Sequence, residues 1–398
     1  MKISKSAQAC VLSPIRKFYP YALAAEKQGR KIYHLNIGQP DIQTPPMFFE
    51  AVHRCKQPVL EYAPSGGIPQ LVSAIQHYYE KMGIHFREED ILVTTGGSEA
   101  LQILMFCILD PGCEVLIPEP FYPNYDTIIR AAGGVIRPIP TTPEEGYRYA
   151  VRERIEALIN DKTRAIMVTN PGNPTGVTLT HDEMRMIADL AKEKELYVIG
   201  DEVYREFYYN NEGLHSMAEF EDAAENVCII DSVSKRFSAC GARVGCLISR
   251  NQELMSNAMK FCQARLSVAT LAQIGSIALY EVDESYFENV RKEYKHRRDV
   301  VMRKLKEIPG VVCTEPRGAF YLMAKLPIDN ADKFQTWLLT DFEDNGETVM
   351  FAPGGPFYAT PGKGVDEVRI AYVLNAVELE RAMDLLALGI KAYNEANK

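Results

Sequence analysis

Four short apolar segments of this sequence end in residues whose types could do chemistry. The segments occupy residues 91–95, 165–168, 198–199 and 227–230, and the sequences that follow them are GGSEA, TNPGNPTG, GDEVY and DSVSK. Each ending alone could be an ordinary turn, because Gly, Pro, Asn and Asp favour turns. Together the endings supply an amine, a carboxylate, an amide, a phenol, two hydroxyls and a guanidinium: Lys235, Asp201, Asn173, Tyr204, Ser98, Ser232 and Arg243.

The elements that must position these residues are strands alternating with helices. Short β-branched runs between residues 90 and 250 are typical of strands buried on both faces, and helical patterns separate several of them. The clearest helix begins at Thr180, which forms a capping box with Glu183. This alternation predicts an α/β fold with a three-layer αβα arrangement and a mainly parallel sheet. The carboxyl ends of parallel strands meet at one edge of the sheet, so we expect the polar endings to share one site.

The glycine turn at Gly97 adds a further requirement. It leads into the apolar helical stretch LQILMFCIL, and the N-terminus of a helix favours a phosphate group. A ligand that needs a phosphate cradle, a buried acid and a lysine is pyridoxal 5'-phosphate. Its aldehyde forms a Schiff base with a lysine, and its pyridine nitrogen takes an acidic partner. A lysine directly after a buried strand, such as Lys235, would be held in place and partly desolvated.

The sequence changes in character after residue 250. A charged helical region spans residues 284–308 and ends at Pro309-Gly310, and short strands follow at residues 319–323 and 368–372. These features predict a smaller α+β domain packed against the first. We expect a large domain at residues 49–283 and a small domain made of residues 1–48 and 284–398, with the site in the cleft between them.

Composition narrows the class of protein. The chain has 398 residues, 44 basic and 53 acidic, and its net charge of -9 argues against a nucleic-acid binder. Nine scattered cysteines without a CxxC pair favour reduced thiols over disulfides or a metal site. The first 20 residues lack the apolar core of a signal peptide, and the longest apolar run, residues 100–109, is too short to span a membrane. We therefore expect a cytoplasmic protein without membrane contacts.

The sequence resembles the fold-type I, pyridoxal-phosphate-dependent aminotransferases of the class I/II family, which includes the aspartate and aromatic aminotransferases. The resemblance covers nearly the whole chain, and its motifs occur in the family's order: NIGQPD at 36–41, GGSEAL at 96–101, NPGNPTG at 170–176, DEVY at 201–204, SVSKRFSACGARVG at 232–245 and VRIAYVL at 368–374. It implies a transaminase that works by a ping-pong mechanism as a homodimer with shared active sites.

The resemblance implies a role for each matching residue. Lys235 corresponds to the Schiff-base lysine, which later moves a proton between the substrate α-carbon and the cofactor. Asp201 corresponds to the acid that keeps the pyridine nitrogen protonated, and Asn173 and Tyr204 to the donors that contact the phenolic oxygen. The residues that correspond to the phosphate cradle are Gly97, Ser98, Ser232 and Arg243.

Other positions correspond to contacts with the ring, the substrate and the neighbouring subunit. Tyr122 matches the aromatic residue that stacks on the ring, and Tyr62 matches a tyrosine that reaches the phosphate from the other subunit. Arg369 matches the arginine that binds the substrate α-carboxylate, a task suited to its two-pronged geometry. Gly38 and Asn173 are expected beside that carboxylate.

The side chain of the substrate is less well defined. Aspartate-preferring members often carry a lysine in the GGSEA turn, where this chain has Ser98 and Glu99. Arg16 and Arg265 are candidates to replace it, whereas the aromatic residues of SPIRKFYP (13–20) would suit an aromatic donor. We expect an aspartate-like or aromatic donor and 2-oxoglutarate as the acceptor. Arg236 has no expected role and is predicted to lie on the surface.

Three other functional classes are alternatives to an aminotransferase. A nicotinamide dehydrogenase would need a G-x-G-x-x-G turn after an early strand, and the segment GGPFYATPGKGVD lacks the spacing of a phosphate-binding P-loop. A carbon–sulfur lyase or another α-carbon enzyme could use the same residues, because they stabilise the carbanion without deciding its fate. A transcription regulator on this fold would need a DNA-binding domain, which about 35 residues ahead of NIGQPD cannot form.

Overall fold

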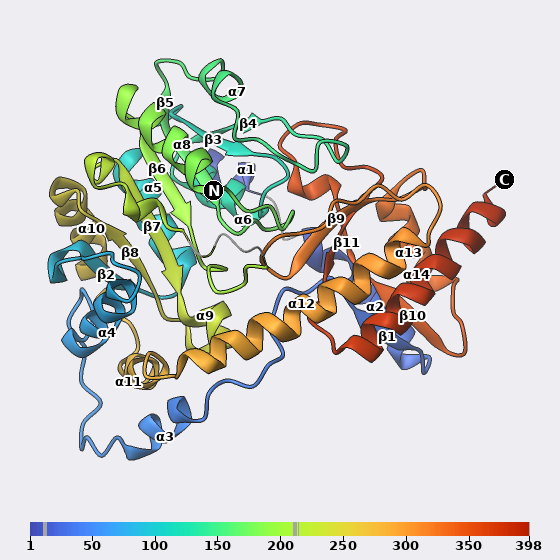
Figure 1. Cartoon of the computed structure of the whole chain (residues 1–398), viewed down its shortest axis with the longest axis horizontal. Coiled ribbons are helices and arrows are strands. Elements are labelled where there is room, and N and C mark those ends of the chain that lie inside the picture. Colours follow the sequence, from blue (N-terminus) through green and yellow to red (C-terminus); the bar gives the residue numbers. More distant parts are fainter. Residues whose placement is uncertain (11–13, 210–212, 214, 398) are drawn as a thin grey trace.

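The fold is built on a seven-stranded mixed sheet with the strand order β2-β8-β7-β6-β5-β3-β4 (Figure 1). The structure is a computed structural model that describes the chain except residues 11–13, 210–212, 214 and 398. Strand β8 is antiparallel to both of its neighbours, and the other neighbouring pairs are parallel. The strands are β2 (Ile91–Thr94), β3 (Glu114–Pro118), β4 (Val135–Ile139), β5 (Thr163–Thr169), β6 (Tyr197–Asp201), β7 (Val227–Ser232) and β8 (Gly245–Ser249).

Successive residues of the central strands pack into two different cores. On β5, Ile166 and Val168 belong to one buried cluster, and Ala165 and Met167 belong to the other. The first cluster includes residues of α4 (Pro69–Glu80) and α8 (His181–Glu193), and the second includes residues of α5 (Gly97–Ile108) and α10 (Gln252–Arg265). Because side chains alternate along a strand, the sheet is covered on both faces. The predicted three-layer arrangement is confirmed.

A second group of strands lies beside the sheet and carries the C-terminal third of the chain (Figure 1). The antiparallel strands β9 (Tyr321–Lys325), β12 (Glu367–Ala371) and β11 (Ala352–Pro353) form one small sheet. Strand β1 (Lys31–His34) pairs in parallel with β10 (Glu347–Met350), so a segment near the N-terminus joins the C-terminal part. The long helices α12 (Glu284–Lys306) and α14 (Ala376–Ala396) contribute to one further core.

Shorter helices complete the described part of the chain. The remaining α-helices are α1 (Lys5–Ala9), α2 (Tyr19–Lys27), α3 (Met47–Arg54), α6 (Asn124–Ala131), α7 (Arg152–Glu156), α9 (Val233–Arg236), α11 (Thr270–Leu279) and α13 (Ala331–Thr340). The 3-10 helices are η1 (Pro14–Phe18), η2 (Glu88–Asp90), η3 (Met217–Glu219), η4 (Glu221–Ala223), η5 (Cys240–Ala242) and η6 (Gly355–Phe357). No helix in the described ranges is long and apolar enough to cross a membrane.

Local sequence signals explain most of these boundaries. Thr180 accepts a hydrogen bond from the Glu183 amide and Glu183 returns one, which is the predicted capping box of α8. Strand β9 begins two residues later than predicted, because Ala319 has a φ of 54°, outside the strand region. Strand β4 was not predicted, since Arg137 and Pro138 interrupt its apolar pattern at the edge of the sheet.

Candidate active site

Most of the predicted site residues surround one cavity of about 1110 Å³. Its walls come from the carboxyl ends of the central strands, from the small sheet and from the N-terminal segment. The predicted residues that line it are Arg16, Gly38, Gly97, Ser98, Tyr122, Asn173, Asp201, Tyr204, Ser232, Lys235, Arg243 and Arg369. The structure thus brings together residues that lie more than 350 positions apart in the chain.

Lys235 is held at the end of a buried strand. It lies on α9, a helix of four residues that begins directly after β7. Its ammonium group donates a hydrogen bond to the Gly38 carbonyl at 3.0 Å. The Ser232 hydroxyl caps the helix, accepting from the Ser234 amide at 3.1 Å and donating to the Val244 carbonyl at 2.9 Å. The half-buried amine is therefore fixed beside the cavity.

Asp201 ends β6 and is 8% exposed. Its carboxylate accepts hydrogen bonds from the Tyr125 hydroxyl at 2.5 Å and from the Val203 amide at 3.3 Å. Burial raises the pKa of Asp201 to about 6, although these two hydrogen bonds act in the opposite direction. A positively charged group placed beside this carboxylate would favour its ionised form.

Asn173, Tyr204 and Arg369 are joined by hydrogen bonds at the base of the cavity. The Asn173 amide donates to the Tyr204 hydroxyl at 3.2 Å, and Arg369 donates to the Asn173 carbonyl oxygen at 3.3 Å. The Tyr204 hydroxyl also lies 3.0 Å from the hydroxyl of Tyr321. Burial raises the pKa of Tyr204 well above its ordinary value, so its hydroxyl stays protonated and able to donate.

A candidate phosphate site lies at the N-terminus of α5. Gly97 and Ser98 begin this helix, and the first amides of a helix have no acceptor within it. The Arg243 guanidinium lies close by, donating to the Thr95 carbonyl at 3.5 Å. Gly96 has a φ of 75°, and a Cβ atom there would lie 2.5 Å from Nη2 of Arg243. The turn needs glycine in order to let the cation approach the helix end.

Arg369 is placed where it could bind a carboxylate. It is 2% exposed, and its Nη2 donates to the Asn36 carbonyl at 2.7 Å. Its Nε atom and the side-chain oxygen of Asn36 have no hydrogen-bond partner among the described residues. A carboxylate in the cavity could accept from this buried guanidinium. Gly38 leaves space here, since a Cβ atom at that position would lie 1.8 Å from the Tyr321 hydroxyl oxygen.

Two predicted residues do not line this cavity. Arg265 forms an ion pair with Glu99 at 3.2 Å and donates to the Val93 carbonyl at 3.1 Å. Tyr62 is 80% exposed and faces solvent in the single chain. Of the two arginines considered for the substrate side chain, only Arg16 lies at the cavity wall.

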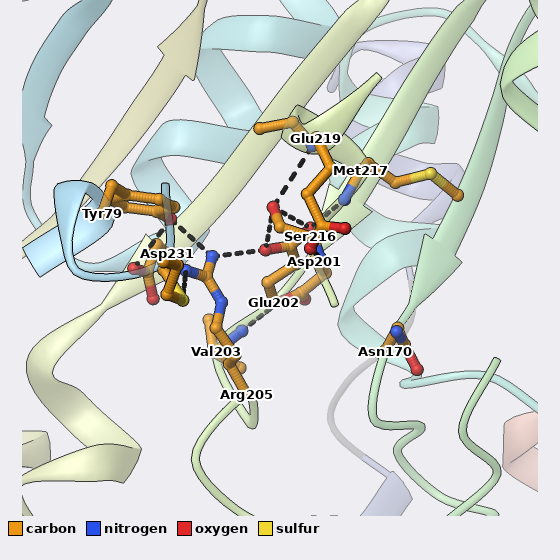
Figure 2. A network of polar contacts seen from close by, with 12 residues as sticks. Tyr79, Asn170, Asp201, Glu202, Val203, Arg205, Ser216, Met217, Glu219 and Asp231 are labelled. Carbon is orange, nitrogen blue, oxygen red and sulfur yellow. Dashed lines mark hydrogen bonds and ion pairs between the residues drawn. The ribbon is translucent and has the colours of Figure 1, made fainter. Parts of the chain in front are cut away.

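The prediction that Arg236 lies on the surface is wrong. Arg236 is 1% exposed and forms a buried ion pair with Asp231. Its guanidinium also lies 4.2 Å from the centre of the Tyr78 ring. Arg236 does not line the cavity and belongs to a network of polar contacts around Asp231, part of which is drawn in Figure 2.

Sequence reasoning missed two tyrosines of the site. Tyr125 lies within EPFYPNY, three residues after Tyr122, and its hydroxyl binds Asp201. Tyr321 lies in the apolar run of β9, and its hydroxyl contacts Tyr204. The signal that could have identified them is the chemistry of the side chain, because the hydroxyl of a buried tyrosine usually requires a hydrogen-bond partner.

Comparisons with known proteins agree with this geometry. Residues 30–386 match the family described as aminotransferase class I and II. The chain is 32% identical to the aspartate aminotransferase of Pyrococcus horikoshii, covering 94% of this chain and 93% of that protein. It is 31% identical to the aspartate/prephenate aminotransferase of Thermus thermophilus, covering 97% and 98%. The structure of alanine aminotransferase from Pyrococcus furiosus superposes with a TM-score of 0.90 at 31% identity, covering 98% and 100%.

Proposed function

We propose that this chain, which belongs to the class I and II aminotransferases and therefore depends on pyridoxal phosphate, transfers the amino group of an acidic amino acid to 2-oxoglutarate. One observation carries the choice of substrate: Arg16 and Arg369 line the same cavity as Lys235. Two guanidinium groups match the two carboxylates of aspartate, and equally those of 2-oxoglutarate. The same site would accept donor and acceptor in turn, as a ping-pong mechanism requires.

The cavity fits the cofactor on the chemistry of its lining residues. Asp201, buried and with a raised pKa, suits a protonated ring nitrogen. The α5 N-terminus, Ser232 and Arg243 suit the phosphate, and Tyr122 forms part of the wall where a ring would stack. When bound, the cofactor supplies the electron sink for the substrate carbanion.

The catalytic roles follow from what each side chain can do. We assign to Lys235, whose amine is held by the Gly38 carbonyl, the covalent attachment of the cofactor and the movement of a proton at the substrate α-carbon. Asp201 would keep the ring nitrogen of the cofactor protonated, and Asn173 and Tyr204, which are hydrogen-bonded to each other, would supply donors for its phenolic oxygen. Arg369, with the Asn173 side chain and the Gly38 backbone beside it, binds the α-carboxylate.

Arg16 would bind the second carboxylate. It lies on η1, directly before α2, in the N-terminal segment that covers the cavity. The lysine and arginine residues that line the described cavity are Arg16, Lys235, Arg243 and Arg369. Because the other three are assigned to the cofactor or the α-carboxylate, Arg16 is the cation left for the substrate side chain.

We also propose a homodimer with shared sites and the division into a large domain (49–283) and a small domain (1–48 and 284–398). Tyr62 and its neighbours Val59 and Leu60 are each more than 60% exposed. Large apolar side chains clustered in this way favour burial against another chain. A second copy of the chain seated on this segment would cover Tyr62, which does not line the cavity of its own chain, and could bring it to the phosphate site of the other copy.

A panel of half-reactions tests the choice of substrate. The purified protein is loaded with pyridoxal phosphate, one amino acid is added at a time, and the visible absorbance is followed. We expect aspartate or glutamate to bleach the visible band, and 2-oxoglutarate to restore it. Bleaching by phenylalanine or tyrosine alone would indicate an aromatic donor, which the exposed Tyr19 at the cavity would suit. Release of ammonia and pyruvate would indicate a lyase.

Two variants of neighbouring residues sharpen the panel. Arg16→Gln should weaken the response to aspartate and 2-oxoglutarate by roughly ten-fold while leaving alanine and phenylalanine unchanged, because it removes one partly solvated charge contact. The matched control is Lys17→Gln, whose ammonium group instead forms an ion pair with Asp332 at 2.5 Å. An equal loss for acidic and neutral substrates would remove Arg16 from the site.

A further inference from the structure

A connected group of buried charged residues lies beside β6, β7 and α9, and part of it is drawn in Figure 2. The residues are the immediate sequence neighbours of the site: Glu202 follows Asp201, Asp231 precedes Ser232, and Arg236 follows Lys235. The charged groups and the tyrosine that joins them are each at most 1% exposed: Glu202, Arg205, Tyr79, Asp231 and Arg236.

The first half of this network holds the end of β6. The Glu202 carboxylate forms a buried ion pair with Arg205. It also accepts hydrogen bonds from the Ser216 hydroxyl at 2.9 Å and from the Met217 amide at 2.9 Å. The Glu202 amide donates to the Ile230 carbonyl of β7 at 3.0 Å, so the residue after Asp201 is fixed in both its side chain and its backbone.

The second half holds the short helix that carries Lys235. Asp231, on β7, forms a buried ion pair with Arg236, the last residue of α9. The Asp231 carboxylate also accepts from the Ser232 amide at 2.7 Å. The ion pair therefore ties the far end of a four-residue helix back to the strand that precedes it, across the turn that contains the amine.

Tyr79 of α4 joins the two halves. Its hydroxyl accepts a hydrogen bond from Arg205 at 2.5 Å and donates one to Asp231 at 3.1 Å. The Arg205 guanidinium lies 4.3 Å from the centre of the same tyrosine ring. One phenol thus links the ion pair behind Asp201 to the ion pair behind Lys235.

We propose that this network is a positioning device that fixes the Lys235 amine relative to the Asp201 carboxylate. The proposal rests on the catalytic roles assigned above. Each ion pair constrains the residue next to one reacting group, and a displacement of about 1 Å between reacting groups can cost roughly 100-fold in rate. Charged groups buried this deeply are not the strongest way to stabilise a fold, which leaves geometric specificity as their contribution here.

Charge compensation supports the same role. The negative charge of Asp231 is close enough to Asp201 to act on it, and it raises the pKa of that carboxyl. Arg236 pairs with Asp231 and offsets this charge. A change in the network should therefore alter the ionisation of the bound cofactor through Asp201, and it should also alter the position of Lys235.

The test compares two buried tyrosines that differ in their hydrogen bonds. Tyr79→Phe removes the hydroxyl that joins the two halves and keeps the ring. The control is Tyr149→Phe, because Tyr149 is buried in the same hydrophobic cluster and its hydroxyl has no hydrogen-bond partner among the described residues. Both variants are loaded with pyridoxal phosphate, and the pH midpoint of the visible band, kcat and KM are measured.

We expect Tyr79→Phe to move the pH midpoint by about half a unit and to lower kcat by roughly ten-fold, with KM within about two-fold of the wild type. Tyr149→Phe should keep the wild-type midpoint and kcat. A Tyr79→Phe protein that is only less stable, with an unchanged midpoint and kcat, would overturn the positioning role. A wild-type protein that shows no visible band would instead refute the assigned site.

A second pair of variants applies if Tyr79→Phe does not fold. Arg236→Lys keeps a cation beside Asp231, whereas Arg236→Met removes it. The lysine variant should have a midpoint closer to the wild type than the methionine variant. Identical midpoints in both variants and the wild type would overturn the proposal.

Discussion

The two sides of the β6 and β7 strand ends differ in whether their carboxylates have a cationic partner. On the cavity side, Asp201 has no cation in contact among the residues that the structure describes, and Nε of Arg369 has no acceptor there. On the opposite side, Glu202 and Asp231 each hold an arginine. Residues next to one another in the sequence thus belong to a site whose carboxylate has no cationic partner and to a supporting network whose two carboxylates are paired. Within that network, Nε of Arg205 and Nε and Nη1 of Arg236 have no hydrogen-bond partner among the described residues.

This difference indicates which buried groups can gain free energy when a ligand binds. A buried polar group without a partner destabilises the empty site, and a ligand that supplies the partner recovers that free energy on binding. The supporting network needs no ligand, because its carboxylates are already paired. Along β7, alternation places Asp231 and Ser232 on opposite faces, whereas Lys235 and Arg236 occupy successive positions of the short helix α9.

The largest effect should come from the cavity side. Lys235→Ala removes the amine proposed both to hold the cofactor and to move the proton. We expect turnover to fall by about 10⁴-fold or more and the visible band of the lysine adduct to disappear. Steady-state kinetics and absorbance spectra measure both effects.

The matched control is Lys260→Ala, which removes an exposed lysine whose ammonium group donates to the Asn257 side chain at 2.7 Å. It should retain wild-type turnover. If Lys235→Ala kept turnover near that of this control, the assignment of Lys235 would fail.

The next largest effect should be on stability, and on the supporting side. Arg236→Met or Asp231→Asn alone leaves its partner as an unpaired buried group. We expect each to lower the free energy of unfolding by about 3–5 kcal/mol for the loss of a buried pair. Urea unfolding of the single variants measures this cost.

The double variant Asp231→Asn/Arg236→Met makes the comparison sharper. Because it removes both charges, it should lower the free energy of unfolding by less than the sum of the losses in the two single variants. Strict additivity would contradict a direct interaction between the two residues. Effects near zero in all three variants would mean that the network does not support the strand ends.

Much of the fold and the cavity could be predicted from the sequence. Apolar runs marked the central strands, and their polar endings marked the catalytic edge because parallel strands end together. The class of reaction and the cofactor followed from the motif order and are confirmed by the family match. The roles of individual residues remain predictions.

The supporting side could not be predicted from the sequence in the same way. An arginine is usually exposed, so Arg236 gave no signal of burial. Its ion-pair partner Asp231 is nearby in the sequence, but the hydroxyl that completes the network comes from Tyr79, 152 residues before Asp231. Such an assembly depends on tertiary packing of α4 against the strand ends and leaves no local pattern.

The smallest predicted effect concerns the ionisation of Asp201 in the cofactor-free protein. Burial raises the pKa of this carboxyl from its ordinary value of 3.8 to about 6. A carboxyl whose pKa is higher in the folded state stabilises the fold fully below pH 4, and this contribution is lost as the pH rises to about 6. The shift corresponds to at most about 3 kcal/mol of unfolding free energy, reached only over a pH range that spans both pKa values.

Asp201→Asn removes this titration, so the cofactor-free variant should lose less stability than the wild type between pH 4 and pH 6. Urea unfolding at several pH values measures the two slopes, and Asp182→Asn, which changes a fully exposed carboxylate, serves as the control. Equal slopes for the wild type and Asp201→Asn would show that interactions within the protein already offset the cost of burying the ionised Asp201 carboxylate. The Asp201 carboxylate would then be compensated like the two carboxylates of the network, and the contrast between the two sides would not hold.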